Sequence, residues 1–149
     1  MQIRLMYGNI RGLTSKITSL KEVLSETDAS IACVTETHLS ENKGTLIEGY
    51  TFFGRARAGK AGGGVGIFVK DAMKQCVSPH YNNGGIELMW VPIHRSQQSP
   101  IHVGVYYGKQ EGTNAEEIKE EMDKLTEEIL EMKASGEIIL CMDGNAKLA

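Results

Sequence analysis

Long apolar runs are missing from this sequence. None approaches the ~20 residues that a membrane-spanning helix needs, and the start, Met1-Gln2-Ile3-Arg4, lacks the basic and apolar regions of a signal peptide. We therefore expect no membrane partner and an intracellular location, nuclear or cytoplasmic. Internal repeats, low-complexity segments and linkers are also absent. With 149 residues and 41% hydrophobic content, the chain can bury one core, so residues 1–149 are expected to form a single domain.

Cysteine and histidine are scarce, and neither is arranged for metal binding or nucleophilic catalysis. The three cysteines are Cys33, Cys76 and Cys141, and the four histidines are His38, His80, His94 and His102. The cysteines are odd in number and have none of the spacings of a zinc site, so we interpret them as buried thiols in a reducing compartment. The histidines have no mutual spacing that indicates a metal site.

Acidic residues outnumber basic ones, but the excess is local. The formal net charge is −3, and the stretch from Asn114 to Lys133 alone contains eight acids and three lysines. In this stretch Ile118, Met122 and Leu125 begin an apolar stripe at helical spacing, which predicts an amphipathic helix with a solvated acidic face. The net charge therefore does not exclude a surface elsewhere that binds a polyanion.

The remaining apolar pattern predicts short strands and one further helix. Strands are expected at residues 3–6, 29–35, 49–53, 66–69, 86–93, 101–107 and 138–142, and helices at residues 14–28 and 114–135. The glycine-rich residues 54–64 would join the third and fourth strands as a hairpin. The order of these elements predicts an α/β (α+β) fold, with a mixed β-sheet that carries its helices on one face.

Polar residues follow three of the predicted strands. Asn9 follows the first strand, Glu36 the second, and Asp143 and Asn145 the last, while Tyr107 ends another strand. Two of these positions have a simpler explanation: Asp143-Gly144-Asn145 is good turn sequence, and Glu36 would be the first solvated residue after a strand. If the strands are neighbours, these side chains meet at one sheet edge, where open α/β sheets bind their ligands.

Together these residues would suit metal-assisted cleavage of a phosphate ester. Glu36 would supply the hard oxygen ligand that Mg²⁺ prefers, with Asn9 as a neutral neighbour and Mn²⁺ as an alternative ion. Asp143 would orient or deprotonate the attacking water, and Asn145 would donate to the charge that develops on phosphorus. No nucleophile pattern based on His or Cys competes with this chemistry.

The predicted hairpin connection carries a local excess of positive charge. Arg55, Arg57 and Lys60 lie among glycines, and residues 54–64 contain no acid. One interpretation is a flexible surface loop, because glycine-rich segments are usually mobile. The other is contact with the phosphate backbone of a nucleic acid. The composition of the loop leaves both open.

Six short motifs occur in an order that is similar to a known family. They are Gly8-Asn9-Ile10-Arg11-Gly12, Thr35-Glu36-Thr37-His38-Leu39, Gly49-Tyr50, Gly62-Gly63-Gly64-Val65-Gly66-Ile67-Phe68-Val69, Tyr107-Gly108 and Asp143-Gly144-Asn145-Ala146. With them the chain resembles the endonuclease/exonuclease/phosphatase (DNase I-like) superfamily, above all the apurinic-like endonuclease domain of LINE-type retrotransposons. The resemblance implies a four-layer α/β sandwich that acts on a phosphodiester bond of DNA.

The resemblance also implies a role for each candidate residue. Asn9 and Glu36 would help to hold Mg²⁺. Asp143 and Asn145 would act on the water and on the transition state. Tyr107 would contact the scissile phosphate.

The sequence departs from the family pattern in several places. Met142 stands where the family usually has Gly before Asp143, and Lys109 replaces a usual Pro, so Tyr106 is an alternative to Tyr107. The sequence also has no Ser-Asp-His motif, whose His and Asp complete catalysis in the family. The resemblance therefore implies a C-terminally incomplete domain with little or no activity on its own.

Three functions remain open at this point. The first is a Mg²⁺-dependent endonuclease domain that nicks DNA, as in target-primed retrotransposition. The second is a phosphoesterase of the same superfamily that acts on lipid or nucleotide phosphates. The third is a non-catalytic interaction fragment whose bare sheet face pairs with a second copy, giving a homo-oligomer, or with a complementing second half-domain.

Overall fold

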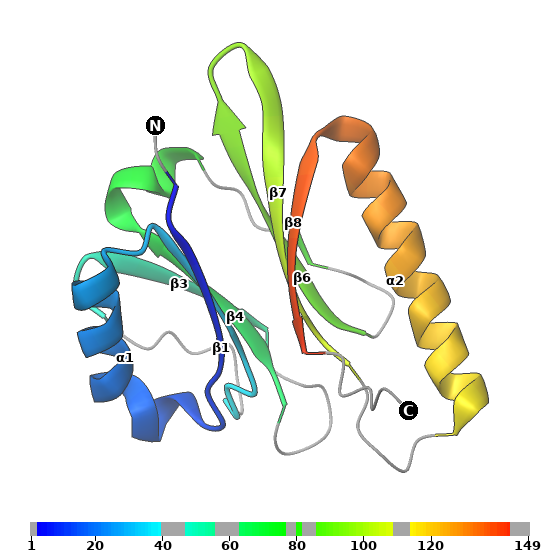
Figure 1. The fold of residues 1–149 in the computed structure, drawn as a ribbon, viewed down its shortest axis with the longest axis horizontal. Coiled ribbons are helices and arrows are strands. Elements are labelled where there is room, and N and C mark those ends of the chain that lie inside the picture. Colours follow the sequence, from blue (N-terminus) through cyan, green and yellow to red (C-terminus); the bar gives the residue numbers. More distant parts are fainter. Residues whose placement is uncertain are drawn as a thin grey trace.

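Two β-sheets packed face to face, with one helix outside each, make up the structure (Figure 1). The computed structural model describes residues 3–39, 47–55, 63–76, 80–81, 86–108 and 114–143. In chain order the elements are β1 (Leu5–Asn9), α1 (Leu13–Thr27), β2 (Ile31–Thr35), β3 (Tyr50–Arg55), β4 (Val65–Lys70), the 3₁₀ helix η1 (Asp71–Cys76), β5 (His80–Tyr81), β6 (Glu87–Arg95), β7 (Gln98–Tyr107), α2 (Ala115–Ser135) and β8 (Glu137–Asp143). No helix in this described part of the chain is long and apolar enough to cross a membrane.

The first sheet, called sheet A, has the strand order β1-β2-β4-β3. β1 and β2 run parallel because α1 carries the chain back between them, and β3 and β4 form the predicted antiparallel hairpin. α1 begins directly after Gly12, whose φ of 101° is easily adopted only by glycine. The helix buries Leu13, Leu20 and Leu24 against the outer face of sheet A.

The second sheet, called sheet B, has the strand order β5-β6-β7-β8. β6 and β7 form a long antiparallel hairpin, and α2 then returns the chain so that β8 lies parallel to β7. Asn114 caps α2, as predicted, by accepting a 2.8 Å hydrogen bond from the backbone N–H of Glu117. Leu125 of α2 packs on the outer face of sheet B, in one cluster with Trp90 and Tyr106.

The main core lies between the two sheets. Strands β2 and β4 of sheet A and β6 and β7 of sheet B fill it with buried side chains such as Ile67, Val91 and Val105. The predicted α/β class is confirmed, and each sheet is mixed with its helix on one face. The expectation of one sheet with a bare face is wrong, because β6 and β7 build a second sheet that covers the inner face of sheet A.

The open part of the sandwich is its edge rather than a face. Among the described strands, β1 and β8 each have a neighbour on one side only, and they border the same side of the sandwich (Figure 1). Large apolar side chains stay exposed on these two strands: Tyr7 is 37% exposed, Ile139 40% and Met142 45%. Unpaired edges of this kind are templates for additional strands.

Candidate active site

The carboxyl ends of β1 and β2 bring Asn9 and Glu36 together. The parallel strands pair Asn9 with Thr35, so Glu36 follows beside Asn9 at the end of sheet A. The amide nitrogen Nδ2 of Asn9 donates a short hydrogen bond to Oε2 of Glu36. Only 15% of the Glu36 side chain is exposed, so this carboxylate is held by the protein rather than freely solvated.

Asp143, the last residue of β8, joins this group from the other sheet. The same Nδ2 atom of Asn9 donates a 2.9 Å hydrogen bond to Oδ2 of Asp143. Two carboxylates from distant parts of the sequence therefore share one amide group. The sequence led us to expect these side chains at one sheet edge. In the structure they lie at one end of the sandwich, where the edge strands β1 and β8 of the two sheets approach each other.

An unusual backbone fixes the segment that carries Glu36. Glu36 and His38 have φ values of 54° and 55°, a left-handed conformation that costs about 1–2 kcal/mol for residues other than glycine. Backbone hydrogen bonds hold the segment in place: the N–H of Thr37 donates to the carbonyl of Gly64 (3.3 Å), and the N–H of His38 donates to the carbonyl of Gly63 (2.8 Å). The glycine-rich motif before β4 thus supports the Glu36 segment.

Gly64 cannot be replaced without a clash in this segment. Its φ is +91°, and a Cβ atom there would lie 2.4 Å from Oγ1 of Thr37. The N–H of Gly64 also donates a 2.6 Å hydrogen bond to Oε1 of Glu87, the first residue of β6. We did not predict a role for Glu87 from the sequence, although a carboxylate at the head of an apolar strand was a usable signal.

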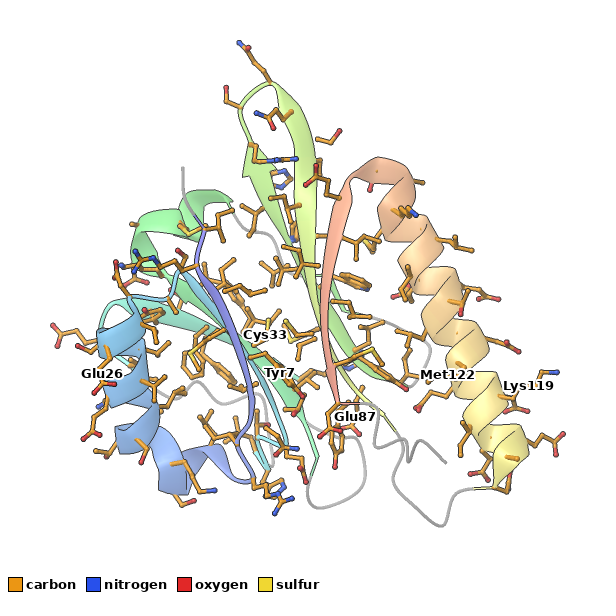
Figure 2. All side chains as sticks on the ribbon, in the orientation of Figure 1. Tyr7, Glu26, Cys33, Glu87, Lys119 and Met122 are labelled. Atoms are coloured by element: carbon orange, nitrogen blue, oxygen red, sulfur yellow. The ribbon has the colours of Figure 1, made fainter. Side chains whose placement is uncertain are left out.

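Glu87 belongs to the same end of the sandwich as the other polar groups. It pairs in register with Tyr107, which pairs in turn with Asp143. Figure 2 shows Glu87 at the end of sheet B where β8 finishes. The last row of residues in sheet B is therefore Glu87, Tyr107 and Asp143, and it faces sheet A.

Tyr107 and Tyr106 point to opposite faces of sheet B. Tyr107 lies in the core between the sheets, on the same face as Asp143, and is 2% exposed. Tyr106 faces α2, where its hydroxyl donates a 2.7 Å hydrogen bond to the buried carboxylate of Glu121. Burial raises the pKa of Tyr106 far above its usual value, and the hydrogen bond to Glu121 adds to the rise. Of the two tyrosines, Tyr107 is the one on the side of the polar group.

Two side chains that the sequence did not single out border the group. Nε2 of His38 lies 3.7 Å from Oε1 of Glu36, and 39% of the His38 side chain is exposed. The hydroxyl of Tyr7 lies 3.2 Å from Oγ1 of Thr35. Burial raises the pKa of Tyr7 and the charge of Asp143 adds to the rise, while the hydrogen bond with Thr35 opposes it. The alternation of side chains along a strand places Tyr7 on the same face of β1 as Asn9.

Arg55 lies at the same end of sheet A, but its guanidinium is partly engaged. Nη1 of Arg55 donates a 3.0 Å hydrogen bond to the backbone carbonyl of Leu88 in β6. This bond ties the two sheets together opposite the β1 and β8 edge. The other predicted site residues, Arg57, Lys60 and Asn145, lie outside the described residues.

The donors available for a metal ion are carboxylate and amide oxygens. Within the residues that the structure describes, no group of three or more His, Cys, Asp or Glu side chains is arranged to hold an ion. Mg²⁺ does not require such a group, because it usually takes one or two carboxylates and fills its other positions with water and substrate phosphate. Asn9, Glu36 and Asp143 form a set of that size, so they suit a hard cation and not zinc.

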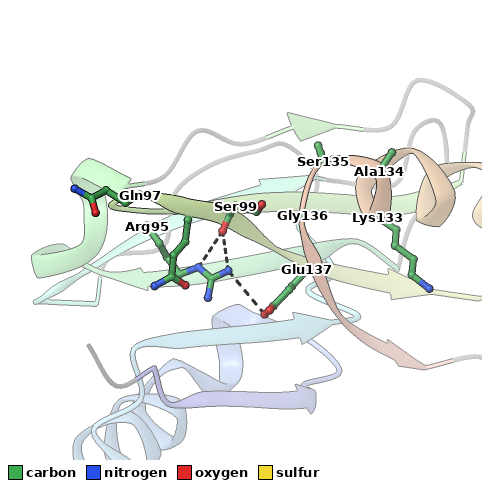
Figure 3. Close-up of a pocket in the computed structure, with 9 residues that line it drawn as sticks. Arg95, Gln97, Ser99, Lys133, Ala134, Ser135, Gly136 and Glu137 are labelled. Carbon is green, nitrogen blue, oxygen red and sulfur yellow. Dashed lines mark hydrogen bonds and ion pairs between the residues drawn. The ribbon is translucent and has the colours of Figure 1, made fainter.

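A separate hollow of about 580 Å³ lies at the opposite end of sheet B (Figure 3). It is bordered by the β6–β7 turn and by the junction of α2 with β8. Nε and Nη2 of Arg95 donate to the carbonyl of Ser99 at 3.0 and 2.7 Å, and Nη2 lies 3.9 Å from a Glu137 carboxylate oxygen. These contacts hold Arg95 within the turn. The hollow lies at the start of β8, whereas Asp143 ends that strand, so the hollow is not part of the candidate site.

A comparison with family profiles decides which family the sequence fits. The profile of the endonuclease/exonuclease/phosphatase family matches residues 6–135, which is most of the chain. The chain belongs to this family. The matched range includes Asn9, Glu36 and Tyr107. None of the curated proteins matches the chain significantly.

Solved structures share the fold of this endonuclease/exonuclease/phosphatase family member. The endonuclease domain of TRAS1, a telomere-specific non-LTR retrotransposon, has a TM-score of 0.70 at 18% identity, covering 97% of this chain and 61% of that one. An AP endonuclease from Archaeoglobus fulgidus has a TM-score of 0.67 at 16% identity, covering 95% and 57%. The 3' phosphatase NExo from Neisseria, bound to a product DNA hairpin, has a TM-score of 0.69 at 17% identity, covering 97% and 58%. These identities establish the fold alone, and the present chain spans about three fifths of each structure.

Proposed function

We propose that this chain carries the larger part of a Mg²⁺-dependent endonuclease site that hydrolyses a phosphodiester bond of DNA. The observation that carries the proposal is the contact of Asn9 with both Glu36 and Asp143. This contact brings carboxylates from both sheets together. The chain belongs to a family of endonucleases, exonucleases and phosphatases. The likeness to the TRAS1 domain favours a retrotransposon enzyme that nicks its target DNA, as in target-primed retrotransposition.

Glu36 and Asn9 would hold the Mg²⁺ ion, or Mn²⁺ in its place. The amide that joins the carboxylates of Glu36 and Asp143 is neutral, so their combined charge attracts a hard cation. When bound, the ion supplies a Lewis acid that polarises the phosphoryl oxygens. The left-handed backbone at Glu36 and the backbone hydrogen bonds of Thr37 and His38 fix the orientation of the carboxylate.

Asp143 would act on the attacking water. Its carboxylate stands at the end of β8, where it would orient the water and accept its proton. Tyr107 lies on the same face of sheet B and would contact the scissile phosphate. Asn145, two residues after Asp143 in the sequence, would donate a hydrogen bond to the negative charge that develops in the transition state.

DNA is the proposed substrate because of the basic connection and the comparisons. Arg55, Arg57 and Lys60 would contact the phosphate backbone. Contacts between basic side chains and phosphates are electrostatic and independent of the DNA sequence. A guanidinium has five N–H donors, so the bond from Arg55 to Leu88 is compatible with a phosphate contact. Similar folds include one bound to a product DNA hairpin and one complexed with single-strand DNA.

Nicking of supercoiled plasmid tests this function. One cut converts a plasmid to the open circle, so the assay detects slow enzymes. We expect a slow conversion by the purified chain that requires Mg²⁺ and is lost in Asp143→Asn, which keeps the shape of the side chain. Glu137→Gln, at the other end of the same strand, is the matched control. An equal nicking rate for the wild type and Asp143→Asn would reject Asp143 as a catalytic residue and point to a contaminating nuclease.

Mg²⁺ is expected to raise the melting temperature of the chain by about 2–5 °C, because a ligand of the native state stabilises it by mass action. Glu36→Gln should remove this rise, since it removes one of the two carboxylate charges. Glu26→Gln is the control, because Glu26 is exposed on α1 (Figure 2). Differential scanning calorimetry with and without Mg²⁺ measures the effect. An undiminished rise in Glu36→Gln would place the ion elsewhere.

A phosphoesterase of the same family is the second candidate. The observation that favours it is the fold shared with NExo, a 3' phosphatase. Release of inorganic phosphate from a 3'-phosphorylated oligonucleotide, without nicking of plasmid, would identify this activity.

We also propose that the edges β1 and β8 receive additional strands. Exposed apolar side chains on both strands support this, and a second copy or a complementing half-domain would supply the partner strands. Sedimentation over a range of concentrations measures self-association, and a monomer at all concentrations would leave the complementing half-domain as the partner.

A further inference from the structure

Two cysteines face each other across the sandwich. Cys33 lies in β2 of sheet A, and Cys141 lies in β8 of sheet B. Cys33 is fully buried in the core between the sheets, and Cys141 packs against the same core while remaining partly accessible. Figure 2 shows Cys33 between the two sheets, beside Tyr7.

The contact between the sheet edges explains why these thiols meet. Asn9 and Asp143 are hydrogen-bonded to each other at the end of the sandwich. Side chains two residues earlier on a strand lie on the same face, so Tyr7 of β1 and Cys141 of β8 occupy the next layer. Tyr7 pairs in register with Cys33. The position of Cys141 opposite Cys33 thus follows from the strand pairing.

The two thiols also differ in their surroundings. The side chain of Cys33 is enclosed in the core, whereas the side chain of Cys141 packs against that core from the edge strand β8. The neighbouring thiol and burial raise the pKa of Cys33. A partly accessible cysteine beside a buried one is the usual arrangement of an attacking and a resolving thiol.

We propose that Cys33 and Cys141 form a reversible disulfide that joins the two sheets when the protein meets a small-molecule disulfide such as oxidised glutathione. The bridge is a modification site separate from the proposed hydrolysis of DNA. It requires no further cofactor. Disulfides in reducing compartments are usually of this transient kind.

The exchange proceeds in two steps. The thiolate of Cys141 attacks one sulfur of oxidised glutathione, which forms a mixed disulfide and releases one glutathione thiolate. The sulfur of Cys33 then attacks Sγ of Cys141, forms the bond between the sheets and releases the second glutathione. The proton of Cys33 goes to a departing thiolate. In total two thiols of the protein lose two electrons, and one glutathione disulfide becomes two molecules of glutathione.

The bridge would restrain the end of the sandwich that carries the candidate site. Cys33 lies in β2, three residues before Glu36, and Cys141 precedes Asp143 on β8. A cross-link between distant parts of the chain reduces the freedom of the unfolded state. The oxidised protein should therefore melt on the order of 10 °C above the reduced protein.

Thiol counting by mass spectrometry tests the proposal on the intact chain. The reduced protein, denatured and alkylated, should take up three maleimides, one for each cysteine. After incubation with oxidised glutathione it should take up one, and peptide mapping should show Cys33 linked to Cys141. Dithiothreitol should restore the reduced pattern.

Single variants separate this bridge from its alternatives. Cys33→Ser should stop at a glutathione adduct on Cys141, whereas Cys76→Ser should still form the bridge. Two results with wild-type protein would overturn the proposal without any variant: a stable glutathione adduct on Cys141 with Cys33 still reduced, or a bridge that includes Cys76. Neither readout depends on nuclease activity, so failure here would leave the proposed function untouched.

Discussion

The purified 149-residue chain is expected to nick DNA about 10²–10⁴-fold more slowly than the TRAS1 endonuclease domain. In the proposed site the chain would supply Asn9, Glu36, Tyr107 and Asp143, but the sequence has no Ser-Asp-His motif. A missing acid or base typically costs about 10²–10⁴ in rate, and a missing group that stabilises charge costs about 10²–10³. The residues present would still bind the ion and position a water.

Plasmid nicking under single-turnover conditions, with both proteins at the same Mg²⁺ concentration, measures this ratio. Rates comparable to the TRAS1 domain, abolished by Glu36→Gln, would contradict the expectation. They would mean that the residues of this chain are sufficient for catalysis. Addition of EDTA controls for metal-independent cleavage.

Replacement of Gly64 by Ala is expected to lower the free energy of unfolding by about 2–5 kcal/mol. A side chain at a positive φ costs about 1–2 kcal/mol, and overpacking costs about 1–3 kcal/mol more. The added Cβ would lie 2.4 Å from Oγ1 of Thr37, so Thr37 must move. Because Thr37 directly follows Glu36, the variant should also lose the stabilisation by Mg²⁺.

Gly8→Ala is the matched control for this variant. Gly8 lies next to Asn9 in β1, and no atom outside its neighbours comes within 4 Å of a Cβ built there. Its substitution should change the free energy of unfolding by less than about 1 kcal/mol. Urea denaturation measures both variants. Equal stability of Gly64→Ala and Gly8→Ala would show that the Glu36 segment does not need the glycine.

The sequence predicted most elements because their patterns are local. The cap of α2 at Asn114 was correct, as was the β3–β4 hairpin. The apolar stripe of α2 was correct from Met122 onward, but Ile118 at its start is exposed. Boundaries were less accurate: Gly8 and Asn9 belong to β1 instead of following it. The short elements η1 and β5 were missed, since Asp71–Cys76 and His80–Tyr81 are too short for a periodic signal.

The division into two sheets was not predictable from periodicity. Apolar runs in β2, β6 and β7 show only that both faces of these strands are buried, and not which strands pair. The meeting of Asn9 with Asp143 depends on that pairing, because β1 and β8 belong to different sheets. The hydrogen bonds of Gly64 with Thr37 and Glu87, and the packing of Cys141 against the core that contains Cys33, join segments far apart in the chain for the same reason.

Paramagnetic broadening by Mn²⁺ in the amide NMR spectrum tests the proposed metal site most directly. The acidic face of α2 competes with the site for cations, since α2 and its flanks contain most of the acidic excess. At substoichiometric Mn²⁺ we predict selective broadening of the signals of Asn9, Glu36 and Asp143 and their neighbours. Glu36→Gln should abolish it. Broadening centred on α2, unchanged in Glu36→Gln, would contradict a metal site at the end of the sandwich.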